Sequence, residues 1–132
     1  MSCPQPAFLT RSIVDRLHNR SLQLYGGLVG VRDDGLVESA IAAAENVWAY
    51  GGGDIFDVAA AYAFHLSQAQ AFFDGNKRTA VAAAFVFLVG NGIPVSNKHD
   101  EQVYDALIAI AERRMTKSEL ATLFRKLYGS KG

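Results

Sequence analysis

An unbroken run of ten apolar residues, 80–89, constrains the fold more than any other part of this chain. The run is too short to cross a bilayer, because a membrane-spanning helix needs about 20 apolar residues. A helix formed by it would be apolar on nearly every side, so neighbouring helices must bury it. The sequence "GNGIP" follows, and its glycines and proline are typical of a helix end. The pattern predicts a central helix over about 76–89.

Helical spacing of apolar residues and helix-capping residues recur along the rest of the chain. Other expected helices are one capped by Thr10 and ending near 25–27, one capped by Asp33 or Asp34 and containing "GLVESAIAAAEN", one from Asp54 through 70, one from about 99 to 113, and one from Thr116, where "TKSE" is a capping box, to about 127. Strand patterns are limited to a short β-hairpin at 46–53 and an extended piece at 93–95. We expect a single all-α domain over 1–132, a bundle of about six helices.

Charge and cysteine content exclude several classes of protein. Thirteen basic residues balance thirteen acidic ones, so the general basic character of a nucleic-acid-binding protein is absent. The single Cys3 cannot form an internal disulfide, and "MSCPQPAF" lacks the basic and apolar segments of a signal peptide. We therefore expect a cytoplasmic protein that contacts neither nucleic acid nor a membrane.

Two adjacent cations, Lys77 and Arg78, lie at the start of the expected central helix. A helix N-terminus already carries about half a positive charge, which disfavours each cation by roughly 0.3–1 kcal/mol. A phosphate group would compensate this charge and would also meet the free backbone N–H groups. Gly75 would permit its close approach, and Asn76 can either cap the helix or donate to a phosphate oxygen.

Asp74 adds a second requirement, because a carboxylate repels a nearby phosphate unless a cation lies between them. Mg²⁺ is usually held by one or two carboxylates together with substrate phosphates. The sequence "DGNKR" therefore predicts a site for ATP and Mg²⁺. The alternative is an ordinary turn followed by two basic side chains that point into water.

The stretch "QAFFDGNKRTAVAAAFVFLVGNG" resembles the signature of the Fic/Doc superfamily, whose motif is His-x-Phe-x-Asp/Glu-Gly/Ala-Asn-Gly/Lys-Arg. The likeness is greatest to the small Doc ("death on curing") branch. Upstream, "YGGLVGVRDDGLVESAIA" is similar to another segment of that branch, so the resemblance covers nearly the whole chain. It implies a buried anchor at Phe72, a Mg²⁺ ligand at Asp74, and a phosphate-binding set of Gly75, Asn76, Lys77 and Arg78.

Two further positions separate the branches of the superfamily. Lys77 stands where AMP-transferring members usually have Gly, and Val81 stands where they carry a second Arg. The resemblance therefore implies transfer of a phosphoryl group, rather than AMP, from ATP to a hydroxyl of a target protein. Members of the Doc branch are typically toxins paired with a small antitoxin, and their known type of target is a Thr of elongation factor Tu.

The segment "NVWAYGGG" falls where the family has its flap, a hairpin that docks the target peptide. Strand addition of this kind needs little side-chain identity. Trp48 and Tyr50 could contact the target there, and the alternative for Trp48 is packing beneath a loop.

Gln70 departs from the motif, which has a His at this position as general base. A Gln amide can orient a hydroxyl but cannot take its proton, and loss of a general base typically costs about 10²–10⁴-fold in rate. His65 lies five residues earlier, which places it on another face of the same helix. His18 and His99 would need the fold to bring them close.

Three hypotheses follow from the motif and its departure. The chain is a weakened Doc-type transferase, or a catalytically silent relative that binds nucleotide or a protein. The third hypothesis is a helical adaptor without affinity for ATP.

Overall fold

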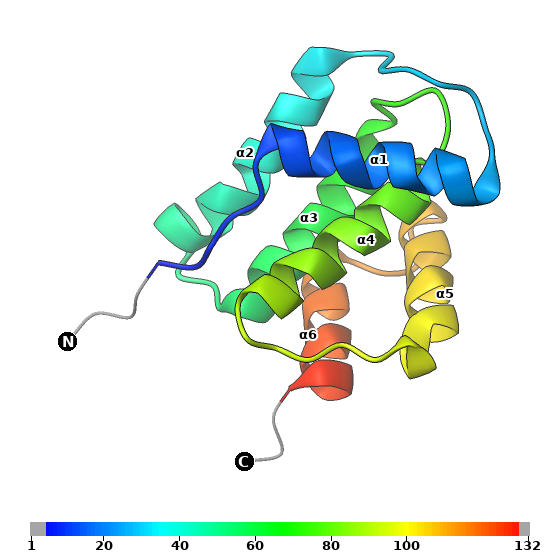
Figure 1. Cartoon of the computed structure of the whole chain (residues 1–132). Coiled ribbons are helices and arrows are strands. Elements are labelled where there is room, and N and C mark those ends of the chain that lie inside the picture. Colours follow the sequence, from blue (N-terminus) through cyan, green and yellow to red (C-terminus); the bar gives the residue numbers. More distant parts are fainter. Residues whose placement is uncertain (1–4, 130–132) are drawn as a thin grey trace.

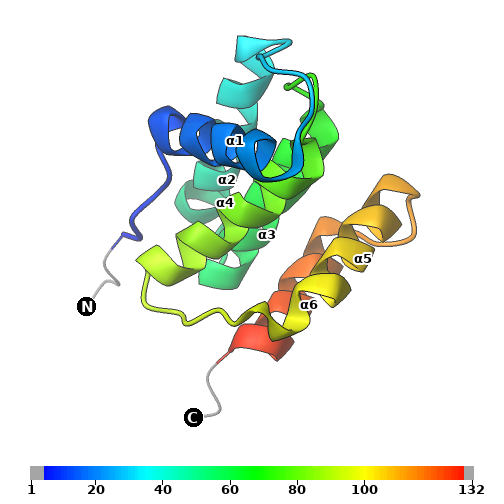
Figure 2. The same cartoon turned by 45° about the vertical axis from the view of Figure 1, so that its right-hand side comes forward.

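Helices joined by short connections make up the part of the chain that the structure describes. This computed structural model describes residues 5–129, and Figures 1 and 2 show it from two sides. Within that range the elements are α1 Arg11–Tyr25, α2 Asp34–Gly51, α3 Ile55–Ala69, α4 Asn76–Gly90, the short 3₁₀ helix η1 Asn97–His99, α5 Asp100–Ala111 and α6 Lys117–Tyr128. The predicted all-α class is confirmed. In residues 5–129 no helix is long and apolar enough to span a bilayer.

Side-chain caps define where four of the helices begin. The Thr10 hydroxyl caps α1, and Asp33, rather than Asp34, caps α2. Reciprocal capping boxes begin two more helices, Asp54 with Asp57 at α3 and Thr116 with Glu119 at α6. Each cap bonds backbone N–H groups that the first helical turn leaves unpaired. These bonds join residues within three positions of each other, so the sequence alone located these helix starts.

The helices α3 and α4 form the centre of the bundle. In Figure 2, α1 and α2 lie on one side of this pair, and α5 and α6 lie on the other. The contacts agree, because α3 packs against α2, α4 and α6 while α1 packs against α4. Buried alanines on both central helices let their backbones approach closely. The predicted central role of α4 is therefore correct but shared with α3. Near the C-terminus of α4, Val86 and Val89 are partly exposed to solvent.

The predicted hairpin at 46–53 is wrong, because α2 continues through Gly51. Its helical face keeps Val47 and Trp48 packed against the core, and this burial outweighs the strand preference of Val, Trp and Tyr. The glycines end the helix rather than form a turn between strands: Gly52 is left-handed and its N–H donates to Val47 O. The piece at 93–95 is not paired with any strand in the described residues.

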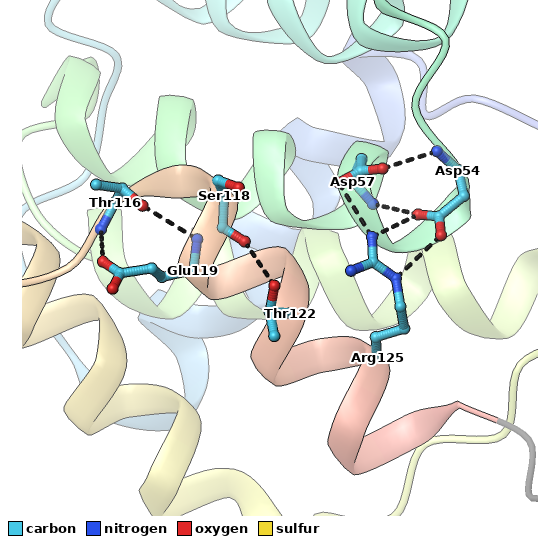
Figure 3. A network of polar contacts seen from close by, with 7 residues as sticks. All are labelled: Asp54, Asp57, Thr116, Ser118, Glu119, Thr122 and Arg125. Carbon is cyan, nitrogen blue, oxygen red and sulfur yellow. Dashed lines mark hydrogen bonds and ion pairs between the residues drawn. The ribbon is translucent and has the colours of Figure 1, made fainter.

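Arg125 fastens α6 to the N-terminal end of α3 (Figure 3). Its Nε and Nη2 lie 3.0 and 3.1 Å from the two carboxylate oxygens of Asp54, and Nη2 lies 3.2 Å from Asp57 Oδ1. This fork-shaped pairing orients the two helices, although exposed ion pairs contribute only about 0–1 kcal/mol each. The contact lies at the opposite end of α3 from Gln70.

Candidate functional site

The connection between α3 and α4, residues 70–75, is here called the motif loop. It lies beside the connection between α1 and α2, residues 26–33 (Figure 1). An isolated antiparallel bridge joins the two segments, and the Arg32 N–H donates to Ala71 O at 2.7 Å. The motif loop is therefore held from the side by a segment about 40 residues earlier in the chain.

Phe72 and His18 support the motif loop from below. The Phe72 side chain is buried, and its ring stacks on the His18 ring with centroids 3.8 Å apart. Because a carbonyl oxygen can only accept, His18 Nε2 donates to Asp74 O, 2.8 Å away. Sequence reasoning set His18 aside. The available signal was its spacing with Val14 and Ser21, which places all three on the inward face of α1.

The Asn76 side chain is used inside the motif loop. Its Oδ1 accepts from the Phe72 N–H at 3.1 Å, and its Nδ2 donates to Phe72 O at 2.9 Å. Asn76 does not cap α4, because the N-cap is Gly75. The backbone N–H of Asn76 and the second hydrogen on its Nδ2 remain as donors to an anion. The side chain fixes the path of the loop instead of forming a helix cap.

Gly75 gives α4 an N-terminus that no described side chain caps. Its φ of 80° lies in the left-handed region, which residues other than glycine rarely adopt. A Cβ there would lie 3.3 Å from Ser21 Oγ, closer than an ordinary contact. The first backbone bond of α4 runs from Thr79 N to Gly75 O. The preceding N–H groups of the first turn thus have no acceptor within their own helix, as anion binding requires.

A pocket of about 550 Å³ opens over this N-terminus. The Arg78 guanidinium lies over the Tyr25 ring, 4.3 Å from its centre, which holds one of the two cations in place. The structure therefore brings together the sequence-predicted residues from 70 to 78, with Phe72 beneath them. The lining residues are Tyr25, Gln70, Phe73, Asp74, Gly75, Asn76, Lys77, Arg78 and Tyr104.

Tyr25 and Tyr104 are pocket residues that sequence reasoning did not find as such. Tyr25 belongs to the "YGG" segment, which the sequence indicated as a helix end and as part of the family resemblance, and Tyr104 comes from α5. Burial raises the pKa of Tyr104 above its ordinary value, so its hydroxyl stays protonated further into the alkaline range. Trp48 and Tyr50, by contrast, line a separate pocket with Phe8.

Asp74 is the acidic residue among those that line the pocket. Its Oδ2 accepts from the Leu28 N–H at 2.6 Å, so this side chain also fixes the α1–α2 connection. No cluster of three or more potential metal ligands occurs among residues 5–129. One carboxylate beside an uncapped helix N-terminus fits Mg²⁺ bound together with phosphate, because such Mg²⁺ needs only one or two carboxylates.

Gln70 is the C-cap of α3 and has left-handed backbone angles, φ 51° and ψ 41°. This conformation costs a residue other than glycine about 1–2 kcal/mol. The side-chain Nε2 donates to Ser67 O at 2.8 Å, so the carboxamide bonds the end of its own helix. The Gln70 carbonyl accepts from the Arg32 guanidinium through Nε, at 2.9 Å, and through Nη2.

None of the three histidines, all of which the structure describes, lines the pocket. His65 Nε2 lies 3.1 Å from Lys117 Nζ, and burial together with the Lys117 charge lowers the pKa of His65. His99 faces the Tyr128 ring, and His18 lies under the motif loop. No histidine is therefore placed to replace a general base at position 70.

Comparison with known proteins supports the sequence resemblance. A profile described as the Fic/DOC family matches residues 8–88. The chain is 35% identical over 115 residues to "Protein kinase doc" of Escherichia phage P1, which covers 86% of this chain and 90% of that protein. It is 38% identical over 94 residues to "Toxin Doc" of Mycolicibacterium smegmatis, which covers 67% of this chain and 71% of that protein. The chain therefore belongs to the Fic/Doc family.

Proposed function

We propose that this chain is a Doc-type, toxin-like protein that binds MgATP and phosphorylates a hydroxyl of a target protein, at a rate reduced by Gln70. One observation carries the proposal: the uncapped start of α4, two cations and one carboxylate meet at a single pocket. The names of the two relatives, a protein kinase and a toxin, agree with it. By the family resemblance, elongation factor Tu is the first target to test and a small antitoxin is the expected inhibitor.

Each group of pocket residues would have a different role in the reaction. The backbone N–H groups that begin α4, with Lys77 and Arg78, would bind phosphate oxygens and stabilise the charge that develops during transfer. Asp74 would hold Mg²⁺, which neutralises phosphate charge when bound. Gln70 would contribute at most orientation of the target hydroxyl. Phosphoryl transfer depends largely on positioning and electrostatics, so the proposal includes a residual rate without a base.

A catalytically silent nucleotide-binding protein is the second candidate. The Gln70 side chain favours it, because one of its two Nε2 hydrogens already donates to Ser67 O and the amide has no nitrogen that can take the proton of a target hydroxyl.

The position of the transferred label distinguishes these functions. We would incubate the protein and Mg²⁺ with purified elongation factor Tu or a cell lysate, using ATP labelled at either the α- or the γ-phosphate. The proposal predicts slow labelling of protein from γ-labelled ATP alone. Labelling from α-labelled ATP would show AMP transfer instead. Binding of MgATP with no labelling from either would favour the silent module.

Calorimetry with MgATP tests the phosphate and metal roles. Arg78→Ala should weaken binding about 10- to 100-fold, since a charge-assisted hydrogen bond is worth roughly 1.5–3 kcal/mol. Asp74→Asn should abolish the contribution of Mg²⁺ to affinity, while its amide oxygen can still accept from the Leu28 N–H. Arg114→Ala is the matched control, because Arg114 pairs only with Glu112 among the described residues and lies outside the pocket. Parent-like binding by both site variants would refute the assigned roles.

A further inference from the structure

We infer that Arg32 is a positioning residue for the reaction, because its side chain fixes the backbone of residue 70. This inference rests on the proposed function and concerns a residue outside the motif. Its guanidinium donates to Gln70 O through both Nε and Nη2. Two donors on one planar group restrain the orientation of the acceptor more than a single donor would.

The geometry of the motif loop explains why residue 70 needs such a restraint. Three backbone bonds hold the loop after residue 70. The N–H groups of Arg32 and Asp33 donate to Ala71 O at 2.7 and 3.1 Å, and the Phe73 N–H donates to Gly30 O at 3.3 Å. Among the hydrogen bonds of the described residues, only those of the Arg32 guanidinium reach residue 70 itself from another element. Residue 70 is also left-handed without being glycine, a conformation that persists only when the surroundings enforce it.

The positive charge of Arg32 also stabilises the backbone at residue 70. The last turn of α3 contains no basic residue. A helix C-terminus carries partial negative charge and favours a cation. Arg32 provides that cation from the α1–α2 connection, at the carbonyl where α3 ends. The guanidinium thus stabilises both the end of α3 and the turn that brings residue 70 to the wall of the pocket.

Amide hydrogen exchange, measured by NMR on the protein as it exists, tests the restraint directly. Arg32→Ala should speed exchange at Phe72 and Phe73 at least several-fold while the amides in the middle of α3 and α4 keep their rates. Arg125→Ala is the matched control: it also removes a two-donor arginine contact at an end of α3, but at the opposite end. Unchanged exchange in the motif loop of Arg32→Ala, or a general increase equal to that in Arg125→Ala, would overturn the inference.

Kinetics in the Gln70→His background test the positioning role. Arg32→Ala should lower kcat about 10- to 100-fold, since small misplacements of a reacting group cost rates of that order. It should leave KM for ATP within about twofold, because Arg32 does not line the phosphate pocket. Arg32→Lys keeps the charge without the fork and should restore kcat in part.

The two experiments separate the inference from the function on which it rests. Should Gln70→His transfer no label, the proposed function fails, and the exchange rates alone decide whether Arg32 fixes residue 70. Should Gln70→His be active while Arg32→Ala leaves kcat unchanged or raises only KM, the proposed function stands and the positioning role is refuted.

Discussion

Gln70→His is expected to raise the rate of phosphoryl transfer by about 10²–10⁴-fold over the parent protein, the contribution typical of a general base. Neutral imidazole has a nitrogen that can take the proton of a target hydroxyl, which the Gln amide lacks. The backbone at position 70 suits the change, because His is among the residues enriched at positive φ. The measurement is the initial rate of label transfer from γ-labelled ATP to elongation factor Tu.

A neighbouring glutamine provides the matched control. Gln68 is exposed near the end of the same helix but lines a different pocket, so Gln68→His adds an imidazole outside the site. The parent rate is expected for it. A Gln70→His variant that binds MgATP but transfers no faster than the parent would mean that more than the base is missing. The silent nucleotide-binding protein would then be the better description.

Asn76→Ala is expected to lower the free energy of unfolding by about 2–4 kcal/mol, because it leaves the N–H and C=O of the buried Phe72 without partners, at roughly 1–3 kcal/mol each. Affinity for MgATP should fall with it, since the motif loop loses its internal bonds. Urea denaturation measures the first effect and calorimetry the second.

Asn91→Ala is the control for removing an asparagine. The Asn91 amide also bonds backbone groups, those of Ala7 and Phe87, but most of these bonds are exposed. Water can replace exposed partners, so the cost should be about 1 kcal/mol or less. If Asn76→Ala kept parent stability and lost only nucleotide affinity, its side chain would contact phosphate instead of the loop.

Helix starts and the grouping of site residues could be predicted from the sequence because both depend on neighbours in the chain. A cap such as Thr10 bonds within three residues, and Gln70 to Arg78 are consecutive, so one loop and one helix start place them together. The hairpin prediction failed because a glycine-rich stretch serves equally as a helix end. The packing of Trp48 against the core favours the helix end over a turn between two strands, and the local sequence does not show this packing.

The partners of the motif loop could not be predicted in this way. His18 and Arg32 reach it, and Tyr25 reaches Arg78 at the start of α4, through contacts between segments about 40 residues or more apart, which leave no periodic pattern. A weaker signal existed in the glycines of "YGGLVG". Gly27 and Gly30 both have positive φ, and a Cβ on either would crowd Asp74 or Phe73. Repeated glycines therefore marked a segment that side chains of the motif loop approach closely.

The placement of Arg78 on the Tyr25 ring bears on how tightly an anion can be held. A free arginine side chain loses about 2 kcal/mol of rotamer entropy when it is immobilised. Stacking on Tyr25 restricts the Arg78 side chain before any ligand binds. Part of its rotamer entropy is therefore lost on folding, and less remains to be lost on binding. An aromatic face also leaves the N–H edges of the guanidinium unoccupied, whereas the three carboxylates around Arg11 occupy its donors. Tyr25 thus prepares a cation for an incoming anion without neutralising it.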